Sequence, residues 1–90
     1  INITGSPSNI YENEITFVNI FPNPAKADFF VHHNMNNPSL EILSIDGKLI
    51  YKRKLLEMKE KIKTSLSSGI YILKLIDNKS SKIQELIIKD

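Results

Sequence analysis

The two histidines of the sequence, His32 and His33, are adjacent, and imidazole is both a common metal ligand and a common general base. Successive side chains of a β-strand point to opposite faces, so neighbouring histidines in a strand cannot hold one ion between them. Two ligands are also fewer than a zinc site needs. We therefore expect no metal and no cofactor, with one histidine on the surface and the other half-buried at a strand end.

Hydroxyls, carboxylates and glycines are present, but they lack the arrangements that catalysis needs. Two short segments, 64–68 and 80–81, are rich in hydroxyls, but the sequence lacks the Gly-x-Ser-x-Gly turn that presents a serine nucleophile. The ten carboxylates are scattered, and no pair has a spacing that predicts a shared cleft. The three glycines are too dispersed for a phosphate-binding loop. The sequence therefore predicts that the protein is not an enzyme.

The charge is unevenly divided along the 90 residues. Residues 1–47 hold one basic and five acidic residues, a net charge of −4, whereas residues 48–90 hold eleven basic and five acidic residues, a net charge of +6. A basic half can indicate nucleic-acid binding, but such sites usually interleave aromatic side chains that stack on bases. The basic stretch from Lys52 to Lys63 has only one aromatic residue beside it, Tyr51. A solvated lysine-rich surface is the simpler interpretation, and we expect no nucleic-acid partner.

The composition predicts one small globular domain behind a linker. Hydrophobic residues make up 41% of the chain and charged residues 24%, the ordinary range for a globular protein. No apolar run approaches the roughly 20 residues that span a bilayer, so we expect no integral membrane segment. Residues 1–14 mix Gly, Ser, Pro and Asn without a period, which predicts a linker from an upstream protein and a domain over 15–90. The initial Ile suggests a C-terminal piece of a longer chain.

Short apolar runs recur every 8 to 12 residues from Ile15 onward, with turn residues between them. This pattern predicts an all-β, antiparallel β-sandwich of about seven strands. The expected strands are 15–21, 28–33, 40–45, 48–54, one within 58–64, 70–77 and 82–89. Asp46-Gly47 predicts a two-residue hairpin turn between the third and fourth strands. The side chains expected in the core are Phe17, Phe29, Val31, Ile42, Tyr71, Leu73 and Leu75.

Residues 55–63 also fit a helix, because their apolar, Glu and Lys residues have helical spacing. We favour a strand, since the segment lacks an N-cap residue and has strand-like neighbours on both sides. The alternating pattern then sets Ile62 on one face and Lys59, Lys61 and Lys63 on the other.

Four blocks of the sequence carry a resemblance to a known family. They are FPNPAKADFFV at 21–31, LEILSIDGKLIY at 40–51, LSSGIYILKL at 66–75 and SKIQELIIK at 81–89. In this order and spacing they resemble the type A C-terminal sorting domain of type IX secretion, also called the Por secretion system. The resemblance implies an immunoglobulin-like sandwich of seven strands. The motif residues carried over are Pro22, Asn23, Pro24, Asp46, Gly47, Lys48, Leu66, Gly69, Tyr71, Lys82 and Lys89.

The same resemblance implies a function in Gram-negative bacteria. The family directs attached upstream cargo out of the periplasm through an outer-membrane translocon, to the cell surface or the medium. A sortase-like peptidase then removes the domain. A peptidase needs accessible, extended backbone, so we expect cleavage in the linker, within Gly5, Ser6, Pro7, Ser8 and Asn9. The alternative is an immunoglobulin-like adhesion or carbohydrate-binding module, which would show an exposed aromatic platform.

Physical chemistry suggests what the motif residues do in the fold. Pro22 and Pro24 lack backbone donors and end the first strand, and Asn23 is expected to cap the turn that they form. Gly69 permits a close approach before Tyr71, whose ring is expected to close one end of the sandwich while its hydroxyl reaches a backbone carbonyl.

Overall fold

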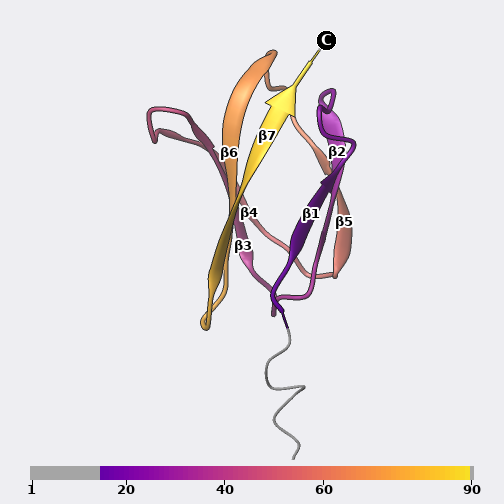
Figure 1. The fold of residues 1–90 in the computed structure, drawn as a ribbon, viewed down its shortest axis with the longest axis vertical. Helices are drawn as coiled ribbons and strands as arrows, with labels where there is room; N and C mark the ends of the chain where they lie inside the picture. The colour runs from indigo at the N-terminus through magenta and orange to yellow at the C-terminus, as the bar shows by residue number, and fades with distance from the viewer. Residues whose placement is uncertain (1–14, 90) are drawn as a thin grey trace, which may run out of the picture.

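Seven strands form two antiparallel sheets that pack face to face in the computed structural model, which describes residues 15–89 (Figure 1). The strands are β1 (Val18–Phe21), β2 (Asp28–His33), β3 (Ser39–Ser44), β4 (Leu49–Lys54), β5 (Lys59–Lys63), β6 (Gly69–Ile76) and β7 (Ser81–Ile88). Residues 15–89 contain no helix. The all-β antiparallel sandwich predicted from the sequence is confirmed.

The sheets have the orders β1-β2-β5 and β4-β3-β6-β7. The chain crosses from one sheet to the other three times, after β2, after β4 and after β5. This combination of hairpins and crossings is that of an immunoglobulin-like sandwich. Strands that are far apart in sequence therefore lie side by side, as β2 and β5 do.

The core lies between the sheets and follows the alternation of the strands. In β2, for example, Phe29, Val31 and His33 point inward and are almost completely buried. The buried hydrophobic residues are Ile20, Ala25, Phe29, Val31, Met35, Leu40, Ile42, Leu55, Ile62, Leu73, Leu75, Leu86 and Ile88. Five of the seven predicted core residues are among them. Phe17 and Tyr71 are only half-buried, because Phe17 precedes β1 and Tyr71 lies near the end of the sandwich.

The segment with helical spacing forms β5, as predicted. Ile62 pairs with Phe29 of β2 and is fully buried, while Lys59, Lys61 and Lys63 are exposed on the outer face. Pairing with β2 and burial of Ile62 outweigh the local helix propensity, which is worth only a few tenths of a kcal/mol per residue.

The first strand is shorter than predicted, beginning at Val18 rather than Ile15. The side chain of Asn34 takes the place of a strand partner for the residues before it. Its Nδ2 donates to the Ile15 carbonyl at 2.8 Å, and its Oδ1 accepts from the Phe17 amide at 2.9 Å. An asparagine amide carries one acceptor group and one donor group, like a peptide unit.

The β3–β4 connection has four residues, 45–48, instead of the predicted two. The Gly47 amide donates to the Ser44 carbonyl and the Ser44 amide donates to the Lys48 carbonyl, each at 2.9 Å. Ile45 and Asp46 therefore occupy the centre of the turn, and Gly47 follows with a φ of 91°. Because Ser44 binds Lys48, the loop inside this pair has three residues, 45–47, and Gly47 takes its left-handed position. The prediction of a two-residue turn was wrong.

Candidate functional site

Three of the four sequence blocks meet at one end of the sandwich, which we call the motif end: residues 22–25, 66–69 and 85–89 (Figure 1). Its centre is Ile88, which is 2% exposed. Ile88 pairs with Gly69 of β6 on one side and forms a parallel bridge with Ala25 on the other. Residues from the first, third and fourth blocks are therefore adjacent.

Asn23 joins the loop after β1 to the last strand. Its Nδ2 donates to the Glu85 carbonyl at 2.9 Å, and its Oδ1 accepts from the Ile87 amide at 3.1 Å. The expectation that Asn23 caps its own turn was therefore wrong: its amide reaches across 62 to 64 residues of sequence. Pro22 and Pro24, each preceded by a cis peptide bond, flank it in the exposed loop where β1 ends, as predicted.

Ala25 extends this junction with its backbone, a role that no sequence pattern indicated. Its amide donates to the Ile87 carbonyl and its carbonyl accepts from the Lys89 amide, both at 2.7 Å. These groups of β7 point away from β6, because strand hydrogen bonds alternate between the two edges of a strand. Asn23 and Ala25 together therefore cover the second half of the β7 edge and tie the two sheets together.

Tyr71 and Gly69 shape the start of β6. The Tyr71 hydroxyl donates to the Ser67 carbonyl at 2.8 Å, which confirms the expected bond to the backbone. A tyrosine bonded in this way near the start of this strand is a feature of immunoglobulin-like domains. Gly69 has a φ of 155° and lies against the Tyr71 ring, and Leu66 packs on the core beside it.

Residues 45–48, in the middle of the second block, form the tip of the β3–β4 hairpin, which extends from the same end because Ser44 pairs with Tyr71. Asp46 accepts a hydrogen bond from the Ser44 hydroxyl. This bond, and to a lesser extent bonds from backbone amides, lowers the pKa of the Asp46 carboxyl below its ordinary value. Lys48 contributes its backbone: its amide donates to the Ser44 hydroxyl oxygen at 3.2 Å. Asp46, Gly47 and Lys48 are all exposed.

Lys82 and Lys89 do not form one surface. Lys82 pairs with Leu75 near the start of β7, whereas Lys89 follows its end at the motif end. Seven residues of extended chain separate their Cα atoms by about 23 Å and turn the two side chains to opposite faces. Ten of the eleven motif residues thus lie at or beside the motif end, and Lys82 lies at the other end.

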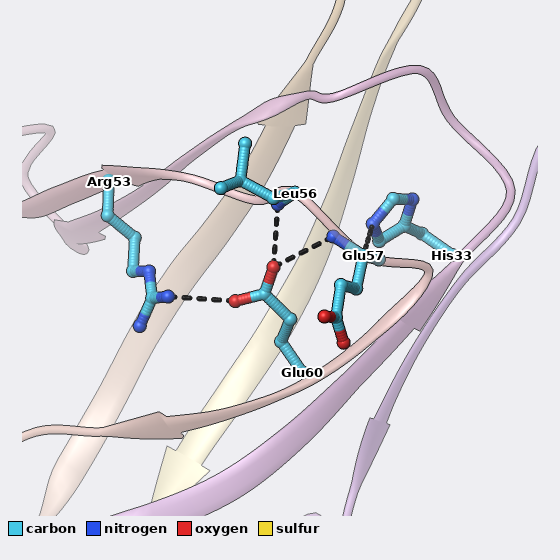
Figure 2. A network of polar contacts seen from close by, with 5 residues as sticks. All are labelled: His33, Arg53, Leu56, Glu57 and Glu60. Carbon is cyan, nitrogen blue, oxygen red and sulfur yellow. Dashed lines mark hydrogen bonds and ion pairs between the residues drawn. The ribbon is translucent and has the colours of Figure 1, made fainter.

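A polar network around Glu60 ties the sheets together at the crossing after β4 (Figure 2). The carboxylate accepts hydrogen bonds from the Leu56 amide at 2.6 Å and the Glu57 amide at 2.9 Å, and it pairs with Arg53 Nη2 of β4 at 2.8 Å. Burial raises the pKa of Glu60, but the two amides and the Arg53 charge outweigh it, so the net pKa lies below the ordinary value. Sequence reasoning missed this network.

The histidines lie on opposite faces of β2, as predicted, but His33 is fully rather than half-buried. Its Nδ1 accepts from the Met35 amide at 3.0 Å. Its Nε2 lies 2.9 Å from the Glu57 carbonyl, which can only accept, so Nε2 carries the proton (Figure 2). Both ring nitrogens are engaged. His32 packs edge-on against Phe17, with ring centroids 5.1 Å apart.

Two aromatic rings lie on the outer face of the three-stranded sheet. Phe21 stacks on Phe30 with centroids 5.6 Å apart, and Lys59 Nζ lies 5.4 and 5.6 Å from the two centroids. The rings therefore contact each other and a cation. A flat platform for a sugar, the feature expected of a carbohydrate-binding module, needs uncovered ring faces.

Several expectations concern residues outside the described part of the chain. The linker 1–14 and the cleavage window Gly5–Asn9 lie there, as does Asp90. Within residues 15–89, no helix is long and apolar enough to cross a membrane, and no group of three or more His, Asp or Glu side chains could hold a metal ion.

The comparisons with known proteins agree with this geometry. A family model described as the secretion system C-terminal sorting domain matches residues 19–89. No curated protein matches the chain. A solved structure of PorZ, described as an essential bacterial surface component of the type IX secretion system of Porphyromonas gingivalis, has the same fold, with a TM-score of 0.70 and 20% sequence identity. The match covers 81% of this chain and 11% of the PorZ chain.

The fold defines the class, an immunoglobulin-like β-sandwich that is one small domain. Because the family match covers most of the sequence, the chain belongs to the family of type IX secretion C-terminal sorting domains. Such a domain is a sorting signal attached to cargo, and it implies export to the cell surface or the medium of a Gram-negative bacterium.

Proposed function

We propose that this domain directs a covalently attached upstream protein from the periplasm through the outer-membrane translocon of the type IX system. The supporting observation is the motif end, where Asn23 and Ala25 bind the outer edge of β7. These hydrogen bonds give residues from distant blocks one fixed arrangement. A translocon that reads a folded surface needs such an arrangement, because a signal spread over four segments has no shape until they assemble.

A fusion of residues 1–90 to a periplasmic reporter tests this function. In a host with type IX secretion the reporter is expected outside the outer membrane, and in the same host without the translocon it should stay in the periplasm. Deleting residues 86–90 removes Ile87 and Lys89, to which Asn23 and Ala25 bind, so that fusion should also remain periplasmic. Retention of the intact fusion in the competent host would disprove the proposal.

We also propose that a sortase-like peptidase cleaves the linker after export, within residues 5–9. Mass spectrometry of exported cargo should find the mature C-terminus in this window. A C-terminus beyond Ile15 would contradict the proposal, since cleavage there would cut into the folded domain.

The domain itself is proposed to act without catalysis or cofactor. This is supported by His33, whose two ring nitrogens are occupied by backbone groups, and by the aromatic contact of His32. Calorimetric titration of the native domain with zinc or calcium should show no binding. Stoichiometric binding at micromolar concentration would overturn this part of the proposal.

A further inference from the structure

The outer face of the four-stranded sheet, which points away from the core, carries aliphatic side chains on all four strands. Leu43 of β3 pairs with Leu49 of β4 and with Ile72 of β6, and Ile70 of β6 pairs with Ile87 of β7. Leu49 is 49% exposed and Ile70 is 51% exposed. We call these five residues, Leu43, Leu49, Ile70, Ile72 and Ile87, the outer patch.

The outer patch is not required to form the core. The opposite faces of the same strands already bury Ile42, Leu73 and Leu86 completely. An antiparallel sheet with one face in solvent usually alternates apolar and polar residues, whereas continuous apolar runs are typical of strands covered on both faces. Residues 70–73 and 86–88 are such runs. A sheet of this kind is expected to be covered by a partner.

A further exposed aliphatic residue, Ile50, lies beside the outer patch on β4 and adds to its apolar surface. The pairing of β3 with β4 shifts between Ile42 and Leu43, so Ile50 is an extra residue beside Leu49. Ile50 is 43% exposed and precedes Tyr51, which points inward. In Figure 1 the hairpin that carries this segment extends away from the body of the sandwich, so a partner can reach it.

Positive charge predominates around the outer patch. Register and alternation place the following charged residues on the same face: Lys52, Lys54, Lys74, Lys89, Glu41 and Glu85. Glu41 pairs with Lys52, whose Nζ lies 3.9 Å from its Oε2. This side of the sheet therefore carries four lysines and two glutamates, an excess of two positive charges.

We propose that the sorting domain docks on its translocon through the outer patch, against a sheet face of a partner protein with an aliphatic centre and an acidic rim. This inference rests on the proposed function and names the partner's chemistry. A second copy of the domain fits less well, because two lysine rims would repel each other. A lipid surface also fits less well, since none of the five residues is aromatic and interfacial binding favours aromatic side chains.

The first test removes apolar surface from the outer patch in the reporter fusion. Leu49→Thr with Ile70→Thr replaces two exposed aliphatic side chains by a residue of high strand propensity. Export is expected to fall by about tenfold or more, as loss of central interface contacts usually does. The control is Leu56→Thr with Met58→Thr, since Leu56 and Met58 are 73% and 55% exposed in the crossing after β4. Both variants should unfold at the wild-type temperature.

The second test concerns the rim and the competing occupants. Lys52→Glu with Lys74→Glu should lower export, whereas Lys52→Arg with Lys74→Arg should not. The purified domain should sediment as a monomer. A dimer that the Leu49→Thr and Ile70→Thr changes dissociate would replace the proposed partner by a second copy. Binding to phosphatidylglycerol vesicles that these changes abolish would replace it by a membrane.

The outcomes separate this inference from the proposed function. If the unchanged fusion is not exported, the proposed function itself fails. If the unchanged fusion is exported and the Leu49→Thr, Ile70→Thr fusion is exported equally well, the outer patch is overturned as a docking site and the sorting function stands.

Discussion

At the scale of single residues, two asparagine side chains form the hydrogen bonds that the backbone of a neighbouring strand would otherwise form. Asn34 binds the residues before β1, and Asn23 binds the outer edge of β7. Each uses both ends of its amide, one as donor and one as acceptor. Aspartate cannot replace either one, because an ionised carboxylate has no donor for the carbonyl partner.

The Tyr71 hydroxyl gives a prediction that isolates one hydrogen bond. Tyr71→Phe keeps the ring and removes the bond to the Ser67 carbonyl, so the free energy of unfolding should fall by about 1 kcal/mol. The control is Tyr51→Phe, a half-buried tyrosine whose hydroxyl has no hydrogen-bond partner among the described residues. Urea denaturation measures both. Equal losses would show that the Ser67 bond adds no stability.

The Glu60 carboxylate gives a pH-dependent prediction. Because folding lowers its pKa, the stabilisation is present above its ordinary value of 4.5 and is lost as the pH falls through the folded-state pKa. Glu60→Gln should therefore cost roughly 1–3 kcal/mol at neutral pH, and the difference from the wild type should shrink in acid.

Thermal unfolding between neutral and acidic pH measures this difference. The control is Glu57→Gln, because the Glu57 side chain is exposed and its backbone groups are unchanged. If the loss of stability in Glu60→Gln stayed constant down to acidic pH, the network would not depend on the negative charge of the Glu60 carboxylate.

At the scale of elements, the edge of β7 should depend on Asn23. Asn23→Ala removes the bonds to Glu85 and Ile87, which should cost about 1–2 kcal/mol and speed hydrogen exchange at the Ile87 amide. Asn36→Ala, at an exposed loop position, is the control. An Ile87 amide that remains equally protected would show that Ala25 holds this edge alone.

The strands could be predicted from the sequence because each depends on a local period. Phe29 and Val31, two residues apart, indicate the buried face of β2, and the lysines around Ile62 indicate the exposed face of β5. The hairpin turn was predicted wrongly for a reason that is also local. Asp-Gly fits both a two-residue turn and the longer loop with Gly47 in the left-handed position, and the pairing of Ser44 with Lys48 decides between them.

The contacts that build the motif end could not be predicted in this way. Asn23 and its partners are 62 and 64 residues apart, and no period in the sequence indicates which strand lies beside the loop. The same holds for Arg53 and Glu60, whose contact depends on where the chain crosses between sheets. The outer patch did have a signal, the continuous apolar runs at 70–73 and 86–88.

At the scale of the whole molecule, the separation of the two lysines on β7 gives a further prediction. Lys89→Ala should lower export of the reporter, because Lys89 lies at the motif end, and Lys82→Ala should leave it unchanged. Both positions are exposed, so each change should alter stability by less than about 0.5 kcal/mol. Export assays with thermal unfolding as a control measure both. If Lys89→Ala and Lys82→Ala changed export equally, the position of Lys89 at the motif end would not matter for sorting.

The hydrogen bonds from Asn23 and Ala25 to β7 determine how early during translation the folded signal can form. The loop near the start of the domain meets its partners only at Glu85, Ile87 and Lys89, so a ribosome must synthesise almost the entire domain first. A chain truncated by premature termination before Glu85 has nothing for Asn23 to hold. The junction therefore forms only after synthesis has passed the last strand of the domain, and cargo that carries a shorter piece lacks it.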